Sequence, residues 1–161
     1  MEMPNTYIGT KLINAEPMTR AAYNAFRGWE LPADENGADE GYLVEYLDGG
    51  KPNTATHAGY VSWSPKEQFD NAYRKTNGMS FGLAVEAVKK GKRIARAGWN
   101  GKGMFLIYIF PYINDQFTII EKDSIVGTLA PYLAMKTADN QLVPWLASQT
   151  DILADDWCIV E

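Results

Sequence analysis

Four short segments of the chain are predicted to be helices, from capping residues at their starts and, in the second and third, from apolar residues at helical spacing. Helices are expected over residues 20–27, from Pro65 to about Arg74, over 81–90, and over a short segment after Ser148. Thr19, Ser80 and Ser148 each carry a side-chain oxygen that accepts a hydrogen bond from a first helical turn. The stretch Ser64-Pro65-Lys66-Glu67 combines a capping box with proline at the first helical position, which predicts the second helix. Gly28 is expected to end the first helix.

Runs rich in aromatic and β-branched residues lie between these helices and are bounded by turn-forming residues, a pattern typical of strands. Strands are expected over residues 41–47, 59–63, 92–98, 103–110, 132–137, 141–146 and 157–160. A two-residue hairpin turn at Asn100-Gly101 would pair Ala95 with Leu106. Pro144 has no N–H to donate to a ladder, so its strand is expected at a sheet edge. These elements predict an α+β fold of small antiparallel sheets with short helices.

A polar segment around Gly78 separates two halves of similar length and predicts two modules, residues 1–76 and 77–161. The first half carries seven basic and eleven acidic residues, and the second carries eight basic and nine acidic. Most of the basic residues in the second half are crowded between Lys89 and Lys102. The acidic average of the chain therefore hides one local positive patch.

The charge balance and the scarcity of cysteine and histidine argue against several classes of function. A net charge of −5 disfavours general nucleic-acid binding through phosphate neutralisation. The single cysteine, Cys158, allows neither an internal disulfide nor a thiolate metal site, and it is expected to be a small buried side chain. The single histidine, His57, disfavours most metal sites and most acid–base sites built on imidazole. We therefore expect no metal and no cofactor.

Apolar runs are too short for membrane spans, which need about 20 residues. The longest, from Met104 to Pro111, has the length of a strand. The N-terminal residues lack the basic and apolar segments of a secretory signal. We therefore expect a protein that stays in the cytoplasm and has no membrane partner.

Three features of the second half favour a nucleotide ligand with a charged diphosphate. Trp99, Trp145 and Trp157 are candidate stacking platforms, the basic cluster and Lys136 supply cations, and a helix start at Ser148 offers backbone N–H groups. The alternatives are structural. Trp145 and Trp157 can be core residues, the lysines can form a solvated helix end, and Ser148 can form a capping box with Asp151.

The ordered motifs of residues 79–161 resemble the Thoeris anti-defence 2 family of phage proteins. The motifs are the stretches Ser80-Phe81-Gly82-Leu83-Ala84-Val85-Glu86-Ala87-Val88, Arg96-Ala97-Gly98-Trp99-Asn100-Gly101-Lys102-Gly103-Met104, Met135-Lys136-Thr137-Ala138-Asp139 and Val143-Pro144-Trp145-Leu146-Ala147-Ser148-Gln149-Thr150-Asp151. Residues 1–75 resemble instead a small domain that is common in uncharacterised phage and prophage proteins. That second resemblance implies a source and no activity.

The family resemblance implies a sponge that binds glyco-cyclic ADP-ribose, the signal made by the TIR-domain sensor of the bacterial Thoeris system. It implies a homotetramer that holds the signal at interfaces between protomers without cleaving it, in the cytoplasm of the host bacterium. Some members of such sponge families also hold cyclic dinucleotides at a separate site, so a second ligand class is a further expectation.

The residues and the resemblance together give a set of expected ligand-binding residues. They are Trp99, Asn100, Lys136, Thr137, Trp145, Ser148, Gln149, Asp151 and Asp156. No catalytic residue is expected. Two alternatives stay open: an enzyme that degrades such a signal, with Asp155 or Asp156 as its base, and a phage protein-interaction module led by the first half.

Overall fold

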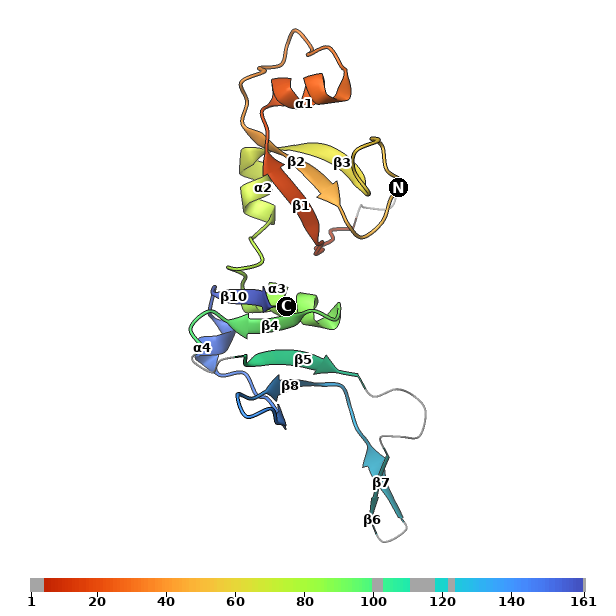
Figure 1. Ribbon diagram of the computed structural model, residues 1–161, viewed down its shortest axis with the longest axis vertical. Helices are drawn as coiled ribbons and strands as arrows, with labels where there is room; N and C mark the ends of the chain where they lie inside the picture. The colour runs from red at the N-terminus through yellow and green to blue at the C-terminus, as the bar shows by residue number, and fades with distance from the viewer. Residues whose placement is uncertain (1–4, 100–102, 111–117, 122–123, 161) are drawn as a thin grey trace. The chain divides into compact units, whose positions relative to one another are not determined.

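A computed structural model of the chain (Figure 1) describes residues 5–99, 103–110, 118–121 and 124–160. The chain divides into two compact units, Met1–Arg74 and Lys75–Glu161, which we call the N-terminal and C-terminal units. Each unit combines antiparallel strands with short helices. The expected α+β fold is thereby confirmed.

The N-terminal unit is built on an antiparallel sheet with the strand order β1-β2-β3. Its elements are β1 (Ile13–Pro17), α1 (Arg20–Arg27), β2 (Gly41–Tyr46), β3 (Tyr60–Pro65) and α2 (Lys66–Ala72). On one face of the sheet, buried Tyr23 of α1 packs with buried Leu43 and Val61. On the other face, Phe69 of α2 stacks on Tyr42 with ring centroids 4.0 Å apart. The two short helices therefore lie on opposite faces, because Tyr42 and Leu43 are neighbours in one strand.

The two helices of this unit begin in different ways. Thr19 caps α1 as expected, since its Oγ1 accepts from the N–H of Ala22, and Gly28 ends the helix in the left-handed region at φ +69°. The capping box expected at Ser64 is wrong. Ser64 pairs with Tyr42 inside β3, so its backbone stays extended, and Pro65 becomes the N-cap without any side-chain hydrogen bond. Strand β1 was not expected, and its pairing along the whole of β2 explains it.

The C-terminal unit is built on a five-stranded antiparallel sheet with the order β10-β4-β5-β8-β9. Its helices are α3 (Phe81–Lys89) and α4 (Gln149–Ile152), and its strands are β4 (Arg93–Arg96), β5 (Phe105–Ile109), β6 (Thr118–Glu121), β7 (Ser124–Thr128), β8 (Tyr132–Lys136), β9 (Leu142–Pro144) and β10 (Trp157–Val160). Strands β6 and β7 pair with each other as a separate hairpin, which the sequence patterns did not predict. Ser80 caps α3 as expected, through a hydrogen bond from the N–H of Leu83.

The pairing of the strands tests two expectations in this unit. Pro144 lies in β9 at the edge of the sheet, which confirms the edge position. The register expected for the β4–β5 hairpin is wrong, because Leu106 lies opposite Ile94 and not opposite Ala95. The observed register puts Ile94 and Leu106, both fully buried, on the face covered by α3.

The two faces of the five-stranded sheet differ in what covers them. The face toward α3 holds the core, in which Ala84 and Val88 pack with Ile94, Leu106 and Trp157. Alternation along the strands assigns another set of residues to the opposite face, which we call the open face. It comprises Arg93, Ala95, Phe105, Ile107, Ile109, Tyr132, Ala134, Lys136, Leu142, Pro144, Cys158 and Val160. No helix of the described residues packs over the open face.

Candidate ligand-binding site

The three tryptophans expected as stacking platforms lie together, but they form part of the core. The ring centroid of Trp157 lies 5.6 Å from that of Trp99 and 5.9 Å from that of Trp145, and both pairs pack edge to face. Trp157 is fully buried, and its indole N–H donates to the carbonyl of Asp151 at 2.9 Å. The structural alternative therefore holds for Trp157. Trp99 and Trp145 are half-buried, so each ring keeps some surface for a ligand.

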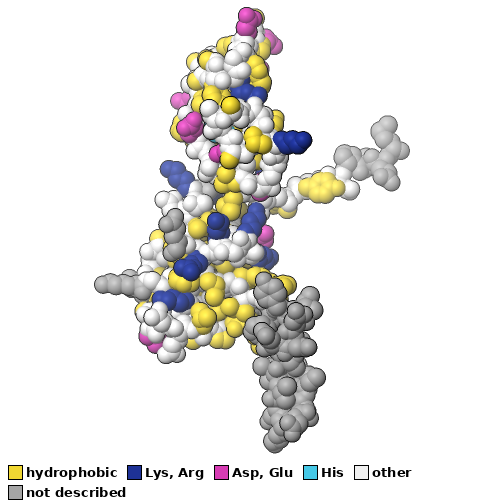
Figure 2. Space-filling view, turned by 45° about the vertical axis from the view of Figure 1, so that its right-hand side comes forward, with side chains coloured by type: hydrophobic (Ala, Val, Ile, Leu, Met, Phe, Trp, Pro, Cys, Tyr) yellow, Lys and Arg dark blue, Asp and Glu magenta, His cyan; other side chains and the backbone are white. Residues whose placement is uncertain are grey.

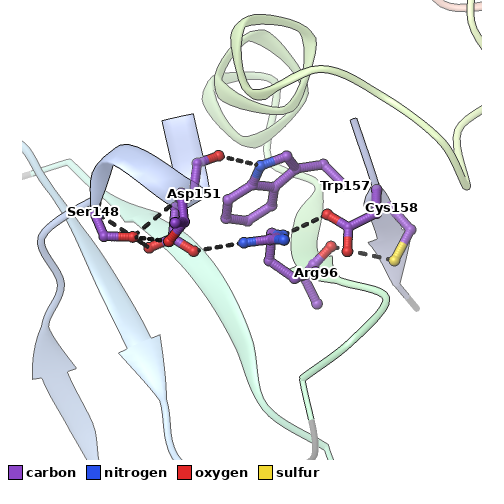
Figure 3. Close-up of polar contacts among 8 residues, drawn as sticks. Arg96, Ser148, Asp151, Trp157 and Cys158 are labelled. Atoms are coloured by element: carbon purple, nitrogen blue, oxygen red, sulfur yellow. Dashed lines mark hydrogen bonds and ion pairs between the residues drawn. The ribbon is translucent and has the colours of Figure 1, made fainter. Parts of the chain in front are cut away.

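Arg96 of β4 binds two of the expected ligand-binding carboxylates (Figure 3). Its Nη1 donates to Asp151 at 2.8 Å, and its Nε forms an ion pair with Asp156. The hydrogen bond to Asp156 raises the pKa of Arg96. The pKa of Asp151 is lowered by the hydrogen bond from the Ser148 hydroxyl and, to a lesser extent, by those from the Ser148 N–H and from Arg96. Both carboxylates therefore share the single positive charge of Arg96, which is not a free cation for a phosphate.

Ser148 and Asp151 form the capping box that stood as the structural alternative to a phosphate site. The Ser148 Oγ accepts from the Asp151 N–H at 3.1 Å, and the Asp151 carboxylate accepts from the Ser148 N–H at 3.0 Å. Gln149 is the exposed first residue of α4. The side chains of Ser148 and Asp151 thus stabilise the helix start and are engaged with each other's backbone.

The remaining expected residues lie in or near turns of the sheet. Thr137 follows β8, and its Oγ1 accepts from the N–H of Gln141 at 3.0 Å and contacts the Asp139 carboxylate. That contact lowers the pKa of Asp139. Lys136 donates to the carbonyl of Gly103 at 3.2 Å. Asn100 lies outside the described residues.

A group on the open face joins the expected Lys136 and a residue of the expected basic cluster, Arg93, to Phe105, which sequence reasoning did not select. The Arg93 guanidinium of β4 lies 4.7 Å from the ring centroid of Phe105 in β5, and the Lys136 ammonium of β8 lies 5.9 Å from it. Among the described residues, neither cation forms an ion pair. The sequence indicated the two cations, whereas the register that brings them together beside Phe105 came from the fold. This group offers an aromatic ring and two cations without an ion pair among the described residues, which suits an anionic ligand.

The structure offers little for metal chemistry or for a reactive thiol. Over the part of the chain that the structure describes, no three His, Cys, Asp or Glu side chains lie close enough to hold a metal ion. Burial raises the pKa of the Cys158 thiol, whose Sγ lies 3.2 Å from the carbonyl of Ala95. No helix within the described ranges has the length and apolar character to cross a bilayer.

Comparison with known proteins identifies the C-terminal unit. Residues 79–160 match the sequence model of the Thoeris anti-defense 2-like domain. The chain belongs to the Thoeris anti-defense 2-like family. It is similar to the protein Thoeris anti-defense 2 of Bacillus phage SP01, with 40% identity over an alignment of 87 residues that covers 51% of this chain and 94% of that protein. The family supports a phage anti-defence role, and its match begins after the last residue of the N-terminal unit.

Proposed function

We propose that the chain binds and sequesters a cyclic nucleotide-derived immune signal, glyco-cyclic ADP-ribose, in the cytoplasm of the host bacterium. The signal is held without being cleaved, so that the Thoeris effector is not activated. The observation that carries this proposal is the family match over residues 79–160, together with 40% identity to a phage protein named for action against Thoeris. A sponge for a scarce messenger needs nanomolar affinity, which corresponds to about −12 kcal/mol.

The group of Arg93, Phe105 and Lys136 supports the anion-binding part of this proposal. The two phosphates of the signal need cations that no carboxylate neutralises, and Arg93 and Lys136 meet that requirement among the described residues. Thr137 follows Lys136 directly, and the exposed parts of Trp99 and Trp145 supply aromatic surface within the same unit. Charge-assisted hydrogen bonds to phosphate are among the strong ones, which favours this arrangement.

The open face supports assembly of several copies. It presents apolar side chains that no described helix covers, with Leu142 57% exposed at its edge strand. Apolar surface of this kind favours pairing with a second copy. We propose a homotetramer that holds the signal at interfaces between protomers. Cyclic dinucleotides are proposed as a second ligand class at a separate site.

A test separates binding from cleavage. The purified chain is titrated with glyco-cyclic ADP-ribose by calorimetry, and the bound ligand is then released by denaturing the protein and identified by mass spectrometry. A sponge gives nanomolar affinity and intact ligand. Recovery of a hydrolysed or isomerised product supports the alternative of an enzyme, and absence of binding contradicts both. Linear ADP-ribose serves as the control ligand.

The enzyme alternative relies on Asp155 or Asp156 as a base. Asp156 is ion-paired with Arg96, so its carboxylate is engaged within the fold. Asp155 is exposed between α4 and β10. The structure thus gives the binding proposal more support than the enzyme alternative.

A further inference from the structure

The N-terminal unit contains a hollow that the proposed function does not use. It lies between α1, the segment that follows α1, and β3, and it has a volume of about 580 Å³. We call it the acidic hollow. Its walls include the rings of Tyr23, Trp29 and Trp63 and the carboxylates of Glu30 and Glu35. Trp29 is 53% exposed, an unusual position for so large a ring and one that favours a role in binding.

The cation that lines the hollow is already neutralised. Arg20 pairs with Glu35 at 3.0 Å and with Asp39 at 3.2 Å, and its guanidinium lies 4.4 Å from the ring centroid of Trp63. Among the residues that the structure describes, Glu30 has no ion pair, so its carboxylate stays uncompensated. A second cation, Arg27, lies over the ring of Trp29 and forms no ion pair among the described residues. Two cations thus face the three carboxylates of Glu30, Glu35 and Asp39, and the surroundings of the hollow keep a net negative charge.

The negative charge continues beyond the hollow. The segment 30–40 contains Glu30, Asp34, Glu35, Asp39 and Glu40 and no basic residue. Figure 2 shows acidic side chains on the part of the N-terminal unit where Figure 1 draws α1 and the loop after it. Residues 1–74 contain six basic and eleven acidic residues, so the whole unit has an acidic balance.

Aromatic walls and uncompensated carboxylates favour a cationic occupant. The faces of tryptophan rings attract guanidinium and ammonium groups, and two arginines of this unit already lie over tryptophan rings. Arg20 lies over Trp63, and Arg27 lies 4.3 Å from the ring centroid of Trp29. A further cation that enters the hollow would meet the exposed part of Trp29 and the Glu30 carboxylate together.

We propose that the acidic hollow docks a basic segment of a partner protein, with one Lys or Arg side chain inserted against Trp29. A protein segment fits better than a small cation because the acidic residues extend past the hollow to Asp34 and Glu40. Several basic residues in a row would pair with this wider acidic surface. This inference concerns the N-terminal unit alone and does not depend on what the C-terminal unit binds.

The test uses the full chain and a defined probe, a synthetic hexapeptide of alternating lysine and arginine, measured by calorimetry. We expect micromolar binding that weakens as salt rises, since the charges are exposed. Glu30→Gln removes the uncompensated charge at constant shape and is expected to weaken binding at least threefold. Trp29→Ala is expected to weaken it at least tenfold, whereas Trp29→Phe keeps an aromatic face and restores much of the affinity. Glu67→Gln, an equal change of charge on α2 outside the hollow, is the matched control.

Several results would overturn the proposal. One is that the hexapeptide does not bind. Another is that Glu30→Gln and Glu67→Gln weaken its binding equally, which would show that only the net charge of the unit matters. Tetramethylammonium chloride that binds as tightly as the hexapeptide would show a small-cation site in place of a protein-docking site. Thermal unfolding of each variant shows whether it is folded, and Glu30→Gln keeps the test valid should Trp29→Ala unfold.

Discussion

Arg96 shows how one residue can fix several distant parts of the C-terminal unit. Its guanidinium bonds to Asp151 of α4 and to Asp156 just before β10, and it lies 5.9 Å from the ring centroid of Trp157. The side chains of Arg96 and Asp151 are 21% and 17% exposed, so water screens the pair only in part. The contacts of Arg96 with Asp151 and Asp156 therefore help to hold α4 beside Trp157.

Arg96→Ala is expected to lower the free energy of unfolding by about 2 kcal/mol, because it removes charge-assisted hydrogen bonds and leaves two carboxylates near each other without a cation. Urea unfolding followed by tryptophan fluorescence measures the change. Arg93→Ala in the same strand is the control, because Arg93 is exposed and has no ion pair among the described residues. Equal destabilisation by the two variants would contradict the role given to Arg96.

The lowered pKa of Asp151 predicts a pH dependence of stability. A carboxyl whose pKa is lower in the folded state stabilises the fold above its unfolded pKa of 3.8, and that contribution is lost as the pH falls through the folded value. Asp151→Asn is expected to lower stability at pH 7 and to flatten the decline below about pH 4. Unfolding curves at several pH values measure both effects. Asp155→Asn, an exposed neighbour, should leave the slope unchanged, and the same slope in Asp151→Asn would refute the assignment.

At the scale of elements, the positions of basic residues on strands β4 and β8 determine which of these cations can bind an anionic ligand. Alternation puts Arg93 and Lys136 on the open face beside Phe105, whereas Arg96 lies where it can reach α4. Arg93 and Arg96 are three residues apart in a single basic run, and the strand directs them to different surroundings. The basic cluster of the sequence is therefore not one site.

Arg93→Gln and Lys136→Gln are each expected to weaken the binding of glyco-cyclic ADP-ribose at least tenfold, about 1.4 kcal/mol, and to reduce its salt dependence. Calorimetry at two salt concentrations measures both quantities. Lys66→Gln on α2 of the N-terminal unit serves as the control with the same loss of charge. Normal affinity in both variants would place the phosphates elsewhere.

At the scale of the whole molecule, the chain combines two units with separate cores. Tyr23, Leu43 and Val61 form one core, and Ile94, Leu106 and Trp157 belong to the other. The relative from Bacillus phage SP01 is matched over 94% of its length by 51% of this chain. A unit of that length is therefore enough for a family member.

A fragment of residues 75–161 is expected to fold alone and to bind glyco-cyclic ADP-ribose with the affinity of the full chain, within about twofold. The reason is that its core contains no residue of the N-terminal unit. Calorimetry and circular dichroism compare the two proteins. A folded fragment that binds much more weakly would show that the N-terminal unit contributes to the site.

The open face predicts the oligomeric state. Light scattering is expected to give a mass well above the 18.0 kDa of one chain, near that of a tetramer. Leu142→Glu adds a charge to the open face at an exposed position and is expected to shift the protein toward smaller species. Ile8→Glu, fully exposed in the N-terminal unit, is the control. A wild-type chain that is monomeric at micromolar concentration would contradict this assembly.

The sequence by itself determined the features that depend on neighbours along the chain. Thr19 with Gly28, Ser80, and Ser148 with Asp151 were predicted as helix ends and are observed as such, because a cap needs only donors a few residues away. Pro144 marked an edge strand because its missing N–H is a property of the residue itself. The ordered motifs of residues 79–161 likewise gave the family without any coordinates.

Only the tertiary structure decided the features that join distant segments. Pairing with β2 kept Ser64 in a strand and removed its capping box, and the pairing of β4 with β5 placed Leu106 opposite Ile94 instead of Ala95. The neutralisation of Arg96 by Asp151 and Asp156 joins residues 55 and 60 positions apart. The energies of such contacts depend on which strands pair and in which register, and a local pattern of residues leaves several pairings open.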